Sequence, residues 1–321
     1  MATEVVVQIE QATGIQLSGT RLLLRPTVAS VAAWLDSPGA SSRVIPLQPL
    51  GSGPAFFCVH GLSGDVFEFV QLAKCLAPEQ PVYGLQAHTE GGRPMILSVK
   101  EMATLCVRGI RSVQPNGPYY LGGFSSGGTI AFEVAQRLRS EGETVALLAL
   151  FDSLYPGYLR SLPSRSWKQR IPLHALTLLR MQVQDVAAYV RQRAATLRER
   201  TRRKVWKIRF KSHLAARRPL PDSLLKIGEV HRQAIEEYQP QSYFGRVVLF
   251  RSLERRGEPD LDLDLGWSGS VPGGVEVHEV PGDHVTMLTT QVLCVAEGLK
   301  ACLEDARETR TPVALTDMAL P

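Results

Sequence analysis

The sequence has few cysteines, and their positions show no pairing. There are five in 321 residues, an odd number, and none are spaced as the paired ligands of a metal site. They are Cys58, Cys75, Cys106, Cys294 and Cys302. We therefore expect free, reduced thiols, no bound metal and a cytoplasmic protein.

Long apolar runs and a targeting segment are also missing. No stretch reaches the roughly 18 apolar residues that a membrane span needs. Residues Met1–Glu4 lack the basic start and apolar core of a signal peptide. With 44% hydrophobic and 21% charged residues, the composition is that of an ordinary globular protein. The length suits one large α/β domain with a small appendage.

Acidic residues are scarce in one segment only. Between Arg160 and Arg218 there are 17 Lys and Arg residues against two acids, Asp185 and Glu199, so this segment carries a formal charge of +15. The net charge of the chain is +5, so the other residues together carry −10. The sequence thus describes an acidic body with one basic insertion.

Strand and helix patterns alternate from Val44 onward. Several of the expected strands are continuous apolar runs, as a mostly parallel sheet covered by helices on both faces requires. The expected strands are Val44–Leu47, Ala55–His60, Val82–Leu85, Tyr119–Gly122, Val145–Phe151, Gly245–Arg251 and Val275–Val280. The expected helices between them are Val66–Leu76, Val99–Val113 and Thr129–Ser140.

The chain divides into a short N-terminal part and a large domain. Residues 1–36 predict two helices, Thr3–Thr13 and Val28–Leu35, with a loop between them. Residues 37–43 read as a linker and residues 44–306 as the domain. Within it, residues 154–225 have helical periodicity without a convincing strand, which predicts a helical insertion. Residues 307–321 are polar and are expected to be a disordered tail.

The clearest chemical motif is Gly123-x-Ser125-x-Gly127, between an apolar strand pattern and a helix pattern. This context is that of a nucleophile elbow, a sharp turn in which small neighbours let the serine hydroxyl stand clear of the sheet. Ser125 is therefore the candidate nucleophile. A serine hydroxyl needs a base, and the base needs an orienting acid.

His284 is the candidate base because it directly follows a late strand. The other six histidines are expected to be structural; they are His60, His88, His174, His213, His231 and His278. For the acid we favour Asp152, which stands at the end of the buried apolar strand Val145–Phe151. With Asp152 as the acid, the chain order is Ser, Asp, His, as in α/β-hydrolases. The alternatives, one strand later, are Asp260, Asp262 and Asp264.

Two backbone N–H groups are needed to stabilise the oxyanion. One is expected from Ser126, directly after the nucleophile at the start of the helix. The other is expected from Leu62, in the glycine-containing loop His60–Gly64 that follows an early strand.

Together these residues resemble a known family, the type I thioesterase domains that end modular polyketide synthases and non-ribosomal peptide synthetases. The resemblance spans roughly residues 44–303 and rests on Phe57–Gly61, Pro81–Gln86, Gly117–Gly128, Leu150–Ser153 and Gly282–Leu288. It implies an α/β-hydrolase fold, assigns the acid to Asp152 and maps the basic insertion onto the helical lid. It also implies that the chain binds no cofactor of its own, because the substrate arrives on the phosphopantetheine of a carrier domain.

Residues 1–36 resemble the second half of an acyl carrier domain, through Val5–Glu10, Ala12–Gly14 and Pro26–Val28. In that family the serine that bears phosphopantetheine lies just before this half. The resemblance therefore implies a remnant that cannot be loaded, in a chain that is the C-terminal piece of a longer synthase. The alternative is a native N-terminal helical arm.

We expect a thioesterase that releases a polyketide or peptide-like acyl chain through a serine acyl-enzyme. Water would release an acid and an internal nucleophile of the chain would release a macrocycle; the residues leave this choice open. The alternatives are a free-standing lipase or esterase, and a carrier-docking module whose triad is idle. The arginine run Arg198–Arg203 is interpreted as a solvated helix face rather than a nucleic-acid or membrane site.

Overall fold

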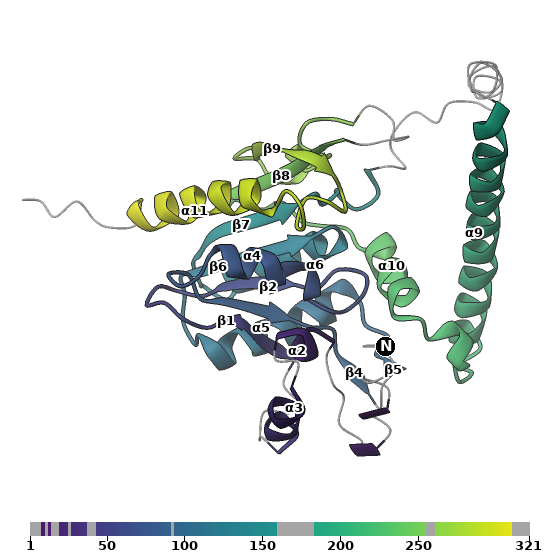
Figure 1. Ribbon diagram of the computed structural model, residues 1–321, viewed down its shortest axis with the longest axis horizontal. Helices are drawn as coiled ribbons and strands as arrows, with labels where there is room; N and C mark the ends of the chain where they lie inside the picture. Colours follow the sequence, from purple (N-terminus) through teal and green to yellow (C-terminus); the bar gives the residue numbers. More distant parts are fainter. Residues whose placement is uncertain are drawn as a thin grey trace, which may run out of the picture. The chain divides into compact units, whose positions relative to one another are not determined.

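A seven-stranded sheet is the centre of the protein (Figure 1). The computed structural model describes residues 8–9, 12–13, 19–24, 27–36, 43–90, 93–158, 183–254 and 261–309. The chain forms two compact units, one of Met1–Pro156 with Ile227–Pro321 and one of Gly157–Lys226. The sheet belongs to the first unit, and its strand order is β1-β3-β2-β6-β7-β8-β9.

The sheet is parallel except at one edge, where β1 runs antiparallel to β3. Its strands are β1 (Val44–Gln48), β2 (Phe56–Val59), β3 (Val82–Leu85), β6 (Tyr119–Phe124), β7 (Val145–Phe151), β8 (Val247–Glu254) and β9 (Glu276–Asp283). Short strands β4 (Thr89–Glu90) and β5 (Arg93–Pro94) pair separately. The expected α/β fold with a mostly parallel sheet is confirmed.

The central strands form because their apolar runs can be buried on both faces. Every residue of β2 is buried, and six of the seven residues of β7 are. The bounds of β3 and β7 coincide with the sequence patterns, whereas β6, β8 and β9 run two to three residues further than expected. These extensions lie at the carboxyl ends of the strands, where parallel sheets place their functional residues.

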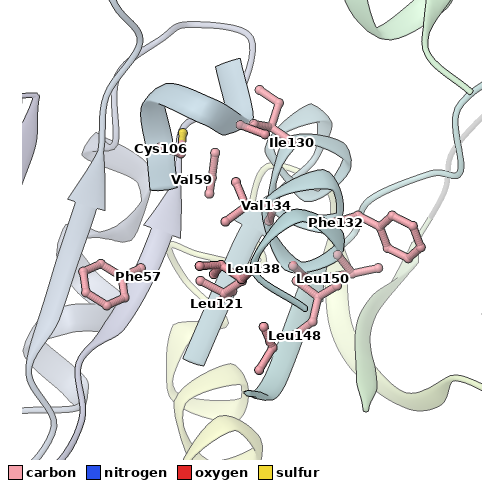
Figure 2. Packing of buried hydrophobic residues seen from close by; sticks show 14 of the residues in the cluster. Phe57, Val59, Cys106, Leu121, Ile130, Phe132, Val134, Leu138, Leu148 and Leu150 are labelled. Carbon is pink, nitrogen blue, oxygen red and sulfur yellow. The ribbon is translucent and has the colours of Figure 1, made fainter. Parts of the chain in front are cut away.

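Two apolar layers cover the sheet, because alternate strand side chains point to opposite faces. On one face, Phe57 and Val59 pack with helices α5 (Val99–Val113) and α6 (Ser126–Ser140). On the other face, Phe56 and Cys58 pack with α4 (Val70–Cys75) and α11 (Val292–Glu308). Figure 2 shows the first layer, in which side chains of α6 lie over those of β6 and β7.

Two expected helices have other bounds: α4 covers only Val70–Cys75 of the expected Val66–Leu76, and α6 begins at Ser126 rather than Thr129. Three further helices lie where none was expected. Helix α2 (Gly19–Leu24) occupies the loop expected between the first two helices, and its Thr20 hydroxyl donates a hydrogen bond to Asp65 of the sheet domain. This tertiary contact stabilises a segment too short to be helical alone. Helices α10 (Ile227–Glu237) and α11 were not anticipated, and α11 extends two residues into the segment expected as tail. The residues after 309 lie outside the described part.

The N-terminal expectations are described only in part. Helix α3 (Val28–Leu35) has the expected bounds. Of the expected helix Thr3–Thr13, the structure describes Gln8, Ile9, Ala12 and Thr13, all helical, and of the linker 37–43 only Arg43. Short 3₁₀ turns complete the elements at η1 (Phe67–Phe69), η2 (Asp222–Leu224) and η3 (Ser268–Ser270).

The second unit is dominated by one long helix. Helix α9 (Val183–Ala215) has 33 residues, and its Trp206 indole N–H donates to the carbonyl of Leu224 at 3.2 Å. This unit corresponds to the helical insertion expected over 154–225, of which residues 159–182 lie outside the described part. Among the described residues, no helix combines the length and apolar character needed to cross a membrane.

Candidate active site

Ser125 sits on a strained turn between β6 and α6. Its backbone has φ 54° and ψ −123°, a region that residues other than glycine rarely adopt. The Ser125 N–H donates to the carbonyl of Phe151 at 2.8 Å, so the turn is tied to the end of β7. A Cβ atom on Gly123 would lie 2.3 Å from the carbonyl oxygen of Gly127, which only glycine tolerates. The local geometry is that of the expected elbow.

Asp152 follows directly after the last residue of β7. Its N–H donates to the carbonyl of Phe250 on β8 at 2.7 Å, and its own backbone has a positive φ of 46°. The carboxylate is buried and accepts two hydrogen bonds from one neighbour: Oδ1 from the Ser252 N–H at 3.0 Å, and Oδ2 from the Ser252 hydroxyl at 2.9 Å. Burying a carboxylate is costly unless such partners satisfy it.

His284 lies on the loop that follows β9, and its Nδ1 is 2.7 Å from Oδ2 of Asp152. The imidazole stacks on the ring of Phe124, with the two centroids 4.6 Å apart. Asp283 organises this loop, because its Oδ1 accepts from the N–H groups of Val285 at 3.0 Å and Thr286 at 2.9 Å. A histidine held by a carboxylate at Nδ1 has Nε2 left for proton transfer.

The three expected residues therefore come from the carboxyl ends of β6, β7 and β9. Phe124, whose ring stacks on His284, directly precedes Ser125 in the chain, so His284 lies beside the elbow. Among the described residues, no hydrogen bond joins the Ser125 hydroxyl to His284; such bonds are often long in an enzyme without substrate.

The alternative acids have other surroundings. Asp264 closes a turn, since its Oδ1 accepts from the Gly266 N–H at 3.1 Å and its Oδ2 from the Ser268 N–H at 2.7 Å. Asp262 accepts a bond at its main-chain carbonyl, from the Leu265 N–H at 3.0 Å. Asp260 lies outside the described part of the chain.

The loop after β2 lies beside the elbow. A Cβ atom on Gly61 would lie 3.6 Å from the Phe124 carbonyl oxygen and 3.9 Å from the Ser126 hydroxyl, so this glycine lies within ordinary contact distance of the elbow. Leu62, the expected second oxyanion donor, follows Gly61 in this loop. Ser126 is the first residue of α6, and the first N–H groups of a helix have no acceptor within the helix.

Buried titratable groups support this loop. Glu68 accepts the Gly61 N–H at 3.3 Å, and burial raises the pKa of its carboxyl. The rings of His60 and His231 are in contact, with centroids 4.9 Å apart and planes tilted by 31°. Burial lowers the pKa of His60 to about 3, and burial lowers that of His231 to about 4 against the opposing effect of hydrogen bonds to the backbone of Leu62 and Gly61. Both histidines are neutral at pH 7.

Sequence reasoning missed Ser252, Phe124 and Glu68. Ser252 could have been found from strand order, because residues near the carboxyl ends of β7 and β8, which pair in parallel with Phe151 opposite Phe250, must be neighbours. No sequence signal singles out the stacking of Phe124 on His284 or the hydrogen bond of Glu68 to Gly61, because both depend on loop conformation.

Within the part of the chain that the structure describes, one group of side chains has donor types that could hold a metal ion. The ligand atoms of Glu276, His278 and Cys302 lie within 4.8 Å of one another. Glu276 is however already paired with Arg246 at 3.0 Å and with His278 at 2.7 Å, and burial raises the pKa of the Cys302 thiol to about 11. These partners satisfy the group without an ion, so we interpret it as structural.

Comparison with known proteins gives a family match. A family model described as a thioesterase domain matches residues 54–301. Malpibaldin synthetase of Mortierella alpina is 29% identical over 294 residues, which cover 89% of this chain and 5% of that protein. Atromentin synthetase invA5 of Paxillus involutus is 29% identical over 286 residues, which cover 84% of this chain and 30% of that protein. The chain thus spans less than a third of the length of these relatives.

Solved structures have the same fold. The NocB thioesterase domain, in a covalent complex with a fluorophosphonate nocardicin G analogue, superposes with a TM-score of 0.54 at 25% identity and covers 81% of this chain and 99% of that one. A four-domain nonribosomal peptide synthetase in its holo form superposes with a TM-score of 0.59 at 22% identity, over 94% of this chain and 23% of that one. The sheet and its helices therefore have the α/β-hydrolase architecture of synthetase thioesterase domains.

Proposed function

The chain belongs to the thioesterase domain family, and we propose that it releases a polyketide or peptide-like acyl chain from a carrier-bound thioester through an acyl-enzyme on Ser125. The observation that carries this proposal is the 2.7 Å contact of His284 Nδ1 with the buried carboxylate of Asp152, at the sheet edge that also bears the strained Ser125. A carboxylate held there orients the imidazole and stabilises the imidazolium that forms when the serine loses its proton.

In the first half-reaction the Ser125 oxygen attacks the thioester carbonyl while His284 Nε2 takes the hydroxyl proton. The carbonyl oxygen becomes an oxyanion, which the N–H groups of Ser126 and Leu62 stabilise; losing one such donor typically costs about 10²–10³ in rate. When the tetrahedral intermediate collapses, the carbon–sulfur bond breaks and the imidazolium returns its proton to the leaving thiolate of phosphopantetheine. The acyl group remains as an ester on Ser125.

The second half-reaction uses the same groups, with Ser125 now as the leaving group. His284 takes a proton from the attacking nucleophile, which adds to the acyl carbon. When this second tetrahedral intermediate collapses, the bond to the Ser125 oxygen breaks and the imidazolium gives the proton to that oxygen. Water as nucleophile releases a free acid, and an internal hydroxyl or amine of the acyl chain releases a macrocycle. The outcome depends on how well the site excludes water and folds the acyl chain.

The partner in this proposal is a loaded acyl carrier domain, in cis or in trans. We extend the proposal to residues 1–36 as the second half of a carrier domain, with 37–43 as linker and 44–306 as the catalytic domain. Residues 1–36 contain no Asp-Ser-Leu, the motif whose serine bears phosphopantetheine in that family. The phosphopantetheine that bears the substrate is therefore supplied from outside residues 1–36.

The test is intact-mass analysis of the protein mixed with acyl-pantetheine thioesters of several chain lengths. We expect an acyl adduct that then decays to acid or macrocycle, and no adduct on the Ser125→Ala variant. An Asp152→Asn variant should acylate on the order of 10⁴-fold more slowly, because the imidazole loses its orienting charge.

Two outcomes would contradict the proposal. Faster turnover of simple oxoesters than of matched thioesters would favour a free-standing esterase. Neither an adduct nor turnover on the parent protein, with pantetheine and carrier-bound substrates alike, would favour an idle docking module.

A further inference from the structure

We propose that Ser252 is a positioning residue that holds the carboxylate of Asp152 in the orientation His284 requires. The inference rests on the proposed function and assigns a role to a residue outside the expected triad. Its basis is that one serine, at the carboxyl end of β8, donates to both oxygens of the carboxylate.

The arrangement follows from the pairing of β7 with β8. The two strands are parallel, with Phe151 opposite Phe250, and the Asp152 N–H donates to the Phe250 carbonyl at 2.7 Å. Ser252 lies two residues further along β8, so its backbone N–H and its hydroxyl both reach across to the Asp152 side chain. Both residues are buried, with relative exposures of 2% for Asp152 and 0% for Ser252.

The two bonds have different roles. The N–H bond to Oδ1, at 3.0 Å, is a backbone bond that no ordinary substitution removes. The hydroxyl bond, at 2.9 Å, goes to Oδ2, the same oxygen that lies 2.7 Å from His284 Nδ1. The Ser252 hydroxyl therefore shares the acceptor oxygen with the catalytic imidazole, and only this bond can be tested by changing the side chain.

The main chain of Asp152 has an unusual conformation, with a positive φ of 46°. A positive φ at a residue other than glycine is strained and persists only where surrounding contacts determine it. Without the hydroxyl, Oδ2 loses one of its donors, while Oδ1 keeps the bond from the Ser252 N–H. A misplacement of about 1 Å in a catalytic group can cost about 10²-fold in rate.

Removal of the Ser252 hydroxyl should also change how strongly the negative charge of the Asp152 carboxylate acts on the His284 imidazole. A hydrogen bond to a carboxylate oxygen stabilises its negative charge, so losing it leaves more of that charge directed at His284. The protonated imidazole is then favoured. The acidic limb of the pH profile of kcat/KM should therefore move to higher pH. On the loop of His284, the neighbouring carboxylate of Asp283 is engaged by the N–H groups of Val285 and Thr286.

The experiment compares Ser252→Ala with Ser153→Ala in the full chain. Ser153 is adjacent to Asp152 in sequence, its exposure is 0%, and its hydroxyl has no hydrogen-bond partner among the described residues. Each variant thus removes one buried serine hydroxyl close to Asp152, but only the Ser252 hydroxyl is bonded to its carboxylate. We expect Ser252→Ala to lower plateau kcat/KM about 10- to 100-fold and to shift the acidic limb upward, whereas Ser153→Ala leaves both unchanged.

A second measurement keeps the inference independent of turnover. Proton NMR detects the strongly downfield N–H signal of an imidazole bonded to a carboxylate, in the parent protein and in each variant. We expect this signal to shift or broaden in Ser252→Ala and to remain in Ser153→Ala, and Ser252→Thr, which restores a hydroxyl, to recover both signal and rate. If the parent has the signal but no thioesterase activity, the proposed function fails while the positioning of Asp152 stands.

Three results would overturn the inference. One is a Ser252→Ala variant with parental kcat/KM, pH limb and NMR signal, even at a lower melting temperature. Another is equal losses in Ser153→Ala, which would indicate a general packing effect. The third is a well-folded Ser252→Thr variant that fails to recover rate and signal.

Discussion

His60, in the loop that follows β2, and His231, on α10, are buried with their ring centroids 4.9 Å apart. Burial lowers the pKa of His60 to about 3 and that of His231 to about 4, so the folded protein keeps both neutral in a range where the unfolded chain binds protons. Because the unfolded state then binds more protons, the free energy of unfolding falls as pH drops below about 6.5. Each histidine contributes up to about 1.4 kcal/mol per pH unit.

We predict that His231→Gln, which keeps a neutral polar side chain, weakens this dependence. Between pH 6.5 and pH 5 the variant should lose about 1–2 kcal/mol less unfolding free energy than the parent protein. Urea unfolding followed by circular dichroism at the two pH values measures the difference. Equal losses in both proteins would show that other groups govern the acid sensitivity.

At the scale of elements, the elbow depends on how closely the start of α6 approaches the end of β2. A Cβ atom on Gly127 would lie 2.5 Å from the Val59 carbonyl oxygen and 2.6 Å from that of His60. Both of these oxygens are backbone atoms at the end of β2. A steric clash between them and a side chain at position 127 can therefore be relieved only by moving helix α6. That movement would displace Ser125 and the Ser126 N–H together.

We therefore predict that Gly127→Ala destabilises the fold by about 1–3 kcal/mol and slows acylation of Ser125. Gly273→Ala is the matched control, because a Cβ atom there meets no atom within 4 Å. Thermal melts give the stability and the mass assay gives the acylation rate. Parental behaviour of Gly127→Ala would mean that the close approach is not required.

At the scale of the whole molecule, charge is concentrated on one helix. Helix α9 contains ten Lys and Arg residues and two acids, and its arginines at 198, 200, 202, 203 and 209 are exposed. Complementary charge steers association, and the effect weakens with salt. The proposed partner is a carrier domain, and an acidic carrier would be attracted to this helix.

We predict that Arg198→Glu with Arg209→Glu raises KM for an acyl-carrier substrate about tenfold at low salt, and leaves KM for acyl-pantetheine unchanged. The control is Lys100→Glu with Arg108→Glu, an equal charge reversal on exposed positions of α5. Equal increases for both substrates would indicate damage to the acyl site. No increase for either would show that the carrier does not use α9.

The sequence by itself determined what depends on near neighbours in the chain. The bounds of β3, β7 and α5 follow from uninterrupted apolar or helical periodicity, and the elbow around Ser125 follows from glycines within two residues of it. Strand order then implied that Asp152 and His284 follow strands of one sheet. Residue spacing alone left Asp260, Asp262 and Asp264 as alternatives, because it does not say which loop folds over the sheet edge.

Only the tertiary structure decided which groups touch. The contact of His284 with Asp152 joins residues 132 positions apart, and those of Ser252 with Asp152 join residues 100 apart. Helix α2 exists where a loop was expected because Thr20 bonds to Asp65, 45 residues away. Such contacts form when the packing of strands and loops offsets the entropy of ordering distant segments, and no local pattern records that balance.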